Sequence, residues 1–192
     1  MTSVTQPTPF EFLLTLEQSI FNSASKTAYH AIPKNDWLGL SFLSGGYVLL
    51  TPLDEIAGIL PVGTLASIPG VRPWLRGMAA YHGEVFPVTD LSGLLKSKIS
   101  MITTDSRIFM IRTPEVCAGL LIDRVLGLQR ISNKDRNENT VKGLTPEYEP
   151  FMVGSILISC SQLPIISCKA VVQHPRFRDV VLRAEETTES GE

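Results

Sequence analysis

The stretch "GMAAYHGEVFPVTDL", residues 77–91, has the pattern of a β-hairpin that runs into a helical turn. Small and apolar residues lead to His82 and Gly83, and the second apolar run contains Pro87. Because glycine readily takes the positive φ of a two-residue turn, we expect Gly83 in that turn and His82 at the hairpin tip. Proline lacks a backbone donor, so Pro87 is expected on an edge strand or at a bend.

Two residues of this stretch have more than one interpretation. Asp90 stands directly before Leu91 at the start of the predicted helical turn, where an aspartate typically caps the helix through its carboxylate. A catalytic aspartate is the alternative at this position. His82 is either a solvated turn residue or a residue that contacts a binding partner.

From Trp37 onward the sequence predicts roughly ten short strands separated by turns. Besides the hairpin, the segments that carry this pattern are "WLGLSFL", "YVLLTP", "EIAGIL", "RIFMIRT", "VCAGLLI", "RVLGLQRI", "FMVGSILIS" and "LPIIS". No long helical pattern lies between them, which argues against parallel βαβ units and favours small antiparallel barrels. The sequence therefore predicts a mainly β fold.

The two ends and one internal segment differ from this strand-rich region. Residues 1–35 are predicted to be an N-terminal extension, with an amphipathic helix over 9–22 and then a linker. Residues 36–175 would hold the strands, and 176–192 a short helix and a polar tail. The polar insert at 132–150 is predicted to be a mobile loop that Val141 and Leu144 pin to the protein. The apolar positions of the N-terminal helix are Phe10, Leu13, Leu14 and Phe21.

Composition excludes several classes of protein. The chain of 192 residues has 17 Lys and Arg against 19 Asp and Glu, a net charge of −2, and no basic cluster. A nucleic-acid-binding barrel is therefore disfavoured, and we expect no nucleic-acid partner. The apolar runs are far shorter than the roughly 20 residues of a membrane helix, and the N-terminus lacks a signal-peptide pattern. We expect a soluble, cytoplasmic protein without direct membrane insertion.

Motifs for catalysis or metal binding are missing from the sequence. There is no P-loop, GxGxxG, HExxH or GxSxG pattern, and the three histidines lack metal-ligand spacing. We therefore expect no catalytic residue, no metal and no cofactor. The alternative is a small hydrolase or transferase that uses a cysteine and a histidine, which requires a thiolate close to His82 or His174. All three cysteines have apolar neighbours and are predicted to be inert thiols: Cys117, Cys160 and Cys168.

Extended to its preceding residues, the hairpin reads "PWLRGMAAYHGEVFPVTDL" and resembles the signature of CheW-like coupling proteins. The segments "LDEIAGIL", "VCAGLLIDRVLGL" and "FMVGSILISCSQLPIIS" resemble flanking pieces of that family in the right order, over residues 37–172. The N-terminal "PFEFLLTLEQSIF" resembles the extension of the adaptors of type IV pilus twitching systems, the PilI type. The matching signature positions are Pro73, Gly77, Gly83, Pro87, Val88, Asp90 and Leu91.

This resemblance implies two SH3-like five-stranded β-barrel subdomains with short helices. It also implies a non-enzymatic adaptor in chemosensory signalling that controls twitching motility. Its partners would be the cytoplasmic tip of a methyl-accepting chemoreceptor and the regulatory domain of a CheA-like histidine kinase. Through them the protein would be recruited to membrane-associated arrays.

The resemblance also assigns roles to individual residues. The positions that it implies for partner binding are Leu53, Glu55, Ile56, Ala80, Tyr81, His82 and Gly83. Structural roles in the motif are implied for Gly77, Pro87, Asp90, Leu91 and Asp123. His82 replaces an arginine of the family, and Cys168 replaces its final aspartate. Because histidine lacks the permanent charge of arginine, we expect a contact there to depend less on a partner carboxylate and more on packing with Tyr81.

Overall fold

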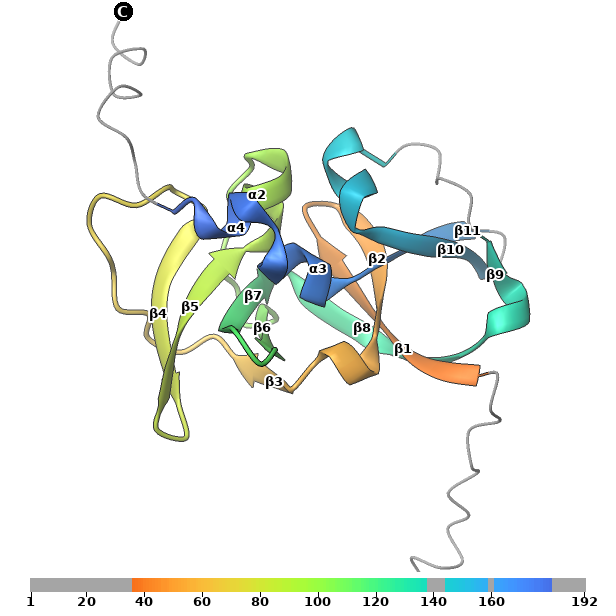
Figure 1. Cartoon of the computed structure of the whole chain (residues 1–192), viewed down its shortest axis with the longest axis horizontal. Coiled ribbons are helices and arrows are strands. Elements are labelled where there is room, and N and C mark those ends of the chain that lie inside the picture. Colours follow the sequence, from red (N-terminus) through yellow and green to blue (C-terminus); the bar gives the residue numbers. More distant parts are fainter. Residues whose placement is uncertain (1–35, 138–143, 159–160, 181–192) are drawn as a thin grey trace, which may run out of the picture. The chain divides into compact units, whose positions relative to one another are not determined.

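The computed structural model describes residues 36–137, 144–158 and 161–180 (Figure 1). The chain divides into two units, Met1–Asp36 and Trp37–Glu192. The helix predicted over 9–22, its linker, Val141 and Cys160 lie outside the described residues.

Within the described residues, eleven strands form two sheets, which confirms the mainly β prediction. Sheet A consists of β1 (Asp36–Ser44), β2 (Tyr47–Pro52), β8 (Arg124–Ser132), β9 (Arg136–Asn137), β10 (Met152–Ile158) and β11 (Ser161–Ile166). Sheet B consists of β3 (Gly58–Pro61), β4 (Leu75–Tyr81), β5 (Glu84–Asp90), β6 (Arg107–Arg112) and β7 (Cys117–Ile122). The strand orders are β8-β1-β2-β11-β10-β9 and β3-β6-β7-β5-β4. Sheet A thus has one strand more than expected, the two-residue β9 inside the polar insert.

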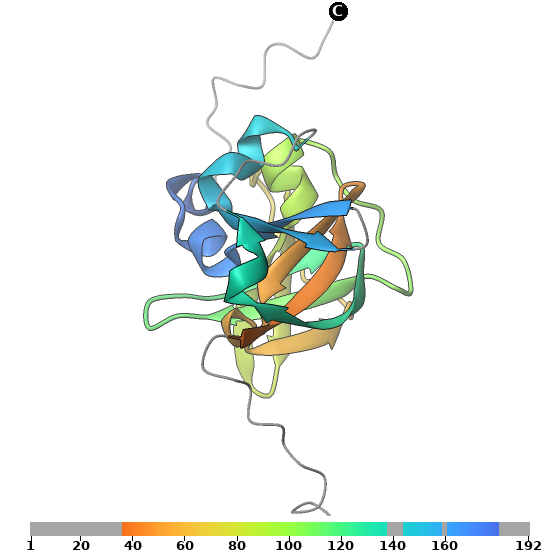
Figure 2. The same ribbon diagram turned by 90° about the vertical axis from the view of Figure 1, so that its right-hand side faces the viewer.

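Short helical segments connect and cover the strands. The α-helices are α2 (Leu91–Lys96), α3 (Cys168–Gln173) and α4 (Pro175–Arg178). The 3-10 helices are η1 (Leu53–Glu55), η2 (Asn133–Asp135) and η3 (Pro146–Phe151). Both views show α2, η3, α3 and α4 gathered on one side of the sheets (Figures 1 and 2). The C-terminal helix begins near its predicted start and buries Phe177, but it ends at Arg178, and residues 181–192 are not described.

The prediction of a loop over 132–150 was wrong, because the described residues of that segment include η2, β9 and most of η3. Tyr148 is fully buried and Phe151 nearly so, and Leu144 packs against the same apolar cluster. Burying each aromatic side chain stabilises the fold by roughly 1.5–3 kcal/mol. These apolar anchors therefore hold η3 against the core although polar residues surround them in the sequence.

The largest apolar cluster joins the two sheets. Phe42 of sheet A meets Phe109 of sheet B edge to face, with ring centroids 5.1 Å apart, and Leu49 and Leu120 belong to the same cluster. Each sheet also has a smaller cluster of its own, around Phe86 in sheet B and around Leu50, Ile131 and Ile165 in sheet A. The molecule therefore has two subdomains that share one interface.

Pro87 was predicted on an edge strand or at a bend, and the first of these two positions was wrong, because β5 is an interior strand of sheet B. Pairing of β5 with β7 begins only at Val88, opposite Gly119. The Asp90 amide donates to the carbonyl of Trp74 on the β4 side. Since backbone donors alternate along a strand, the nitrogen of Pro87 faces the β7 side. Pro87 lies one residue before the β5–β7 ladder begins, so its missing backbone N–H removes no hydrogen bond from that ladder.

Candidate functional site

The predicted hairpin is formed by β4 and β5, with Ala80 opposite Val85 and Tyr81 opposite Glu84. Its two-residue turn has positive φ at both positions, 49° at His82 and 82° at Gly83. Two positive φ angles match a type I′ turn, whose twist fits that of the flanking strands. The turn was predicted, but the positive φ of His82, uncommon outside glycine, was not.

The tip of this hairpin, residues 80–83, is exposed and projects past the other strands of sheet B (Figure 1). The Tyr81 side chain is 40% exposed, and its ring meets the His82 ring edge to face at 4.1 Å. Val85, next to the tip, is 65% exposed. The tip thus presents two aromatic rings on a short turn, outside the apolar clusters of the fold.

The second predicted group, Leu53, Glu55 and Ile56, does not lie on one strand. Leu53 and Glu55 belong to η1, in which the Ile56 amide donates to the Leu53 carbonyl at 3.0 Å, and β3 begins only at Gly58. The prediction of a strand over "EIAGIL" was wrong at its beginning, because Glu55 ends η1 and β3 begins only at Gly58. Leu53 and Ile56 are half-buried and pack against the largest apolar cluster.

Glu55 is bound to the N-terminus of α3. Its carboxylate accepts hydrogen bonds from the Ser167 hydroxyl at 2.9 and 3.0 Å and from the Lys169 amide at 2.9 Å. The Ser167 oxygen in turn accepts from the Ala170 amide as the N-cap of α3. A carboxylate at this helix end satisfies free amide donors and faces the positive end of the helix dipole.

The structure does not bring the two predicted groups together on one element. The strand that follows η1, β3, and the strand that leads to the tip, β4, are the two outer strands of sheet B in its strand order. Three strands therefore separate them along the sheet.

Gly77 allows the loop before β4 to approach the hairpin closely. It lies at a β-bulge with φ of 133°, and a Cβ there would stand 2.4 Å from the carbonyl oxygen of Ala66. Ala66 and Met78 exchange two backbone hydrogen bonds of 2.9 Å. Only glycine allows this close approach, through which the loop before β4 pairs with part of its outer edge.

Asp90 is the N-cap of α2, as predicted, and is fully buried. One carboxylate oxygen accepts from the Gly93 amide at 3.0 Å, and the other accepts from the Ser100 amide at 2.6 Å. The guanidinium of Arg76 stands 3.9 Å from the second oxygen. Because both oxygens are engaged inside the protein, the catalytic alternative has no support. Leu91, the next residue, is fully buried.

Asp123 joins two turns of the chain. Its carboxylate accepts from the Gly45 amide at 2.9 Å, and its own amide donates to the Leu43 carbonyl at 3.0 Å. It therefore fixes the β1–β2 turn against the start of β8.

The described cysteines and histidines each have their own environment and contacts. Burial raises the pKa of the Cys168 thiol to about 12, so it stays protonated at neutral pH. Cys117 is half-buried with its sulfur 4.0 Å from Glu84. His174 accepts from the Arg176 amide through Nδ1 and packs edge to face on Phe151. In the part of the chain that the structure describes, no three His, Cys, Asp or Glu side chains group to hold a metal.

A search of the described residues found no helix both long enough and apolar enough to cross a membrane.

Comparisons with known proteins give the relatives of the chain. Protein PilI of Pseudomonas aeruginosa is 28% identical over 175 residues, which cover 91% of this chain and 97% of PilI. FrzA of Myxococcus xanthus is 33% identical over 94 residues, which cover 49% of this chain and 59% of FrzA. Chemotaxis protein CheW of Thermotoga maritima is 30% identical over 93 residues, which cover 48% of this chain and 61% of that protein.

A solved structure supports the fold. The scaffolding protein TtCheW from Thermoanaerobacter tengcongensis matches with a TM-score of 0.62 at 18% identity, over 73% of this chain and 89% of that one. This likeness confirms the predicted fold class of two SH3-like β subdomains. The family model described as CheW-like domain matches residues 38–176. On this match, which spans most of its length, the chain belongs to the CheW-like family.

Proposed function

We propose that the chain is a non-enzymatic adaptor that couples a methyl-accepting chemoreceptor to a CheA-like histidine kinase, and that it controls type IV pilus twitching. Membership of the CheW-like family makes it a scaffold of chemosensory signalling. The observation that carries the finer assignment is the similarity to PilI. It covers 91% of this chain and extends beyond the CheW-like match at residues 38–176, whereas FrzA and CheW align over about half of it.

The hairpin tip is the proposed contact surface. Tyr81 and His82 are exposed and contact each other, and neither contributes to an apolar cluster of the fold. The two-residue turn fixes the backbone of this tip, which lowers the entropy lost when a partner binds. Aromatic residues that become buried at an interface carry a large share of binding energy. Ala80 and Gly83 complete the tip.

Leu53, Glu55 and Ile56 are proposed as a second contact. Their half-buried side chains leave part of each accessible. Since the Glu55 carboxylate also caps α3, a charge reversal there would disturb the fold together with any contact. The tip residues therefore give the cleaner test.

No observation on the described residues favours the alternative of a cysteine- and histidine-dependent enzyme. The Cys168 thiol is buried with a raised pKa, and the His174 ring caps α4. We propose instead that the protein acts in the cytoplasm, at membrane-associated arrays to which its two partners recruit it.

The test is titration calorimetry of the full chain against the kinase regulatory domain and against the receptor tip from the same organism. We expect both to bind. Tyr81→Ala should weaken one of the two by roughly tenfold, since central aromatic residues cost more than about 1 kcal/mol on truncation, and His82→Ala should weaken it less. Asp105→Ala, in an exposed loop, is the control. All variants should keep the thermal midpoint of the wild type.

Two failures have different meanings. If the wild-type chain binds neither partner, the coupling function is wrong. If it binds both and the tip variants bind like wild type, the function stands and the proposed surface is wrong.

A further inference from the structure

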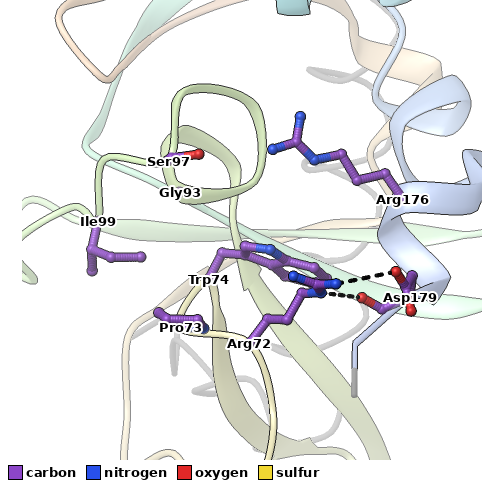
Figure 3. Close-up of a pocket in the computed structure, with 8 residues that line it drawn as sticks. All are labelled: Arg72, Pro73, Trp74, Gly93, Ser97, Ile99, Arg176 and Asp179. Carbon is purple, nitrogen blue, oxygen red and sulfur yellow. Dashed lines mark hydrogen bonds and ion pairs between the residues drawn. The ribbon is translucent and has the colours of Figure 1, made fainter. Parts of the chain in front are cut away.

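A cavity of about 500 Å³ lies beside α4, away from the hairpin tip. Figure 3 shows Arg72 and Trp74 on one side, from the loop that leads to β4, and Ile99 from the segment after α2. Arg176 and Asp179 enter from α4 and the residues that follow it. The proposed function assigns no role to this cavity.

The cavity combines an apolar wall with positive charge. Trp74 and Ile99 supply the apolar part. Arg72 pairs with Asp179, with Nε 3.1 Å from its carbonyl oxygen and a terminal nitrogen 3.4 Å from its carboxylate. Arg176 extends its guanidinium over the cavity (Figure 3), and among the described residues this group has no hydrogen bond or ion pair. An unpaired guanidinium beside an indole suits a ligand with both an apolar group and a carboxylate.

The C-terminal segment of the chain begins at the rim of this cavity. The Val180 carbonyl accepts a hydrogen bond of 2.9 Å from the amide of Arg72, which lines it. Residues 181–192 follow directly and read "VLRAEETTESGE". This segment begins with two apolar residues and then carries four glutamates against one arginine. Its apolar and acidic residues therefore complement the apolar wall of the cavity and the Arg176 guanidinium, which has no ion pair within the described part of the chain.

We propose that residues 181–192 occupy this cavity in the same molecule, with Leu182 against Trp74 and with Glu185 and Glu186 paired to Arg176. Six residues beyond Val180 reach roughly 20 Å when extended, so both carboxylates come within range of a side chain that lines the cavity. The covalent connection gives such a segment a local concentration in the millimolar range, so weak contacts suffice.

The test uses the full chain labelled with ¹⁵N and follows two resonances, Arg176 Nε–H and the Trp74 indole N–H. Glu185→Gln with Glu186→Gln should move both resonances toward the positions that the wild type reaches in about 1 M salt, where ion pairs are screened. Glu189→Gln with Glu192→Gln removes the same charge farther along the tail and should leave both unmoved. Wild-type shifts should not depend on protein concentration.

A charge exchange checks the pairing directly. Arg176→Glu should shift the Trp74 indole resonance towards the position that the wild type reaches in about 1 M salt. Adding Glu185→Arg with Glu186→Arg should return it to the wild-type position. Arg178→Gln is the matched control, because Arg178 pairs with Glu115 outside the cavity.

Three results would overturn the proposal. The first is that the proximal and distal tail variants shift the two resonances equally, or that neither variant shifts them. The second is that the charge exchange gives no restoration. The third is that the tail variants leave both resonances unshifted, whereas an acidic peptide from a partner protein shifts them. The cavity would then be a docking site between molecules.

Discussion

The Glu55 carboxylate accepts two contacts of 2.9 and 3.0 Å from the hydroxyl of Ser167, a residue 112 positions away in the sequence. The pair joins the end of β2 to the beginning of α3. Because Ser167 also caps α3, one hydrogen-bonded unit connects a strand near the start of the described chain to a helix near its end.

Replacing Glu55 should therefore lower the stability of the whole fold. We expect Glu55→Ala to reduce the free energy of unfolding by about 2 kcal/mol, because it removes acceptors at a helix N-terminus and leaves the Lys169 amide without its partner. Asp54→Ala, at an exposed neighbour, should cost less than about 0.5 kcal/mol. Urea unfolding measures both. Equal losses in the two variants would contradict the capping role.

Asp90→Ala should be more damaging than Glu55→Ala, because Asp90 is fully buried. The change leaves two buried amide donors, those of Gly93 and Ser100, without acceptors. The expected loss is about 3 kcal/mol, and Asp90→Asn, which keeps one acceptor oxygen, should cost less. Asp105→Ala is the exposed control. A loss below about 1 kcal/mol for Asp90→Ala would show that water replaces the carboxylate.

Substitutions at two glycines of the hairpin distinguish a steric clash of the new side chain from the strain of a positive φ. Both Gly77 and Gly83 have positive φ, but a Cβ at Gly77 would strike the Ala66 carbonyl, whereas at Gly83 it would meet nothing within 4 Å. We expect Gly83→Ala to cost about 1 kcal/mol and Gly77→Ala clearly more. Thermal unfolding followed by circular dichroism compares them. The reverse order would mean that the loop at Ala66 moves away without loss.

Cys168 should react with a thiol reagent only when the protein unfolds. Its side chain is fully buried, and burial raises its pKa from 9.0 to about 12. Labelling at pH 8 should be slow for Cys168 and should accelerate with urea along the unfolding curve, as read by mass spectrometry of tryptic peptides. Rapid labelling of native Cys168 would contradict this assignment.

The same raised pKa gives a pH dependence. The folded state keeps the thiol proton that the unfolded state loses, so this contribution to stability is present below pH 9 and decreases as the pH rises towards about 12. Cys168→Ala should make the loss of stability across that window smaller. If Cys168→Ala leaves the pH dependence of the unfolding free energy unchanged, other groups account for that dependence. One such group is the buried Tyr148, whose pKa is also raised.

The features that the sequence predicted well depend on neighbouring residues. A histidine and a glycine between two apolar runs specify the turn, and an aspartate before an apolar run specifies the cap at Asp90. The capping of α3 by Glu55 was missed because its partner Ser167 is remote in sequence. The apolar residues around Glu55 also have the pattern of a strand. Tyr148 was missed since one aromatic residue gives no periodicity. The cavity at Arg176 was likewise invisible, because segments about a hundred positions apart line it.

The order of the strands has a consequence for synthesis on the ribosome. Sheet B is built from one continuous segment, β3 to β7, whereas in sheet A β2 pairs in parallel with β11, Leu50 opposite Ile165. At about 5–20 residues per second, the nascent chain needs roughly 6–23 s to extend from β2 to β11. Sheet B can therefore pair co-translationally while one edge of β2 waits unpaired. Until β11 is synthesised, the backbone donors and acceptors along this edge of β2 have no partner strand, and an unpaired edge of this kind can pair with another chain.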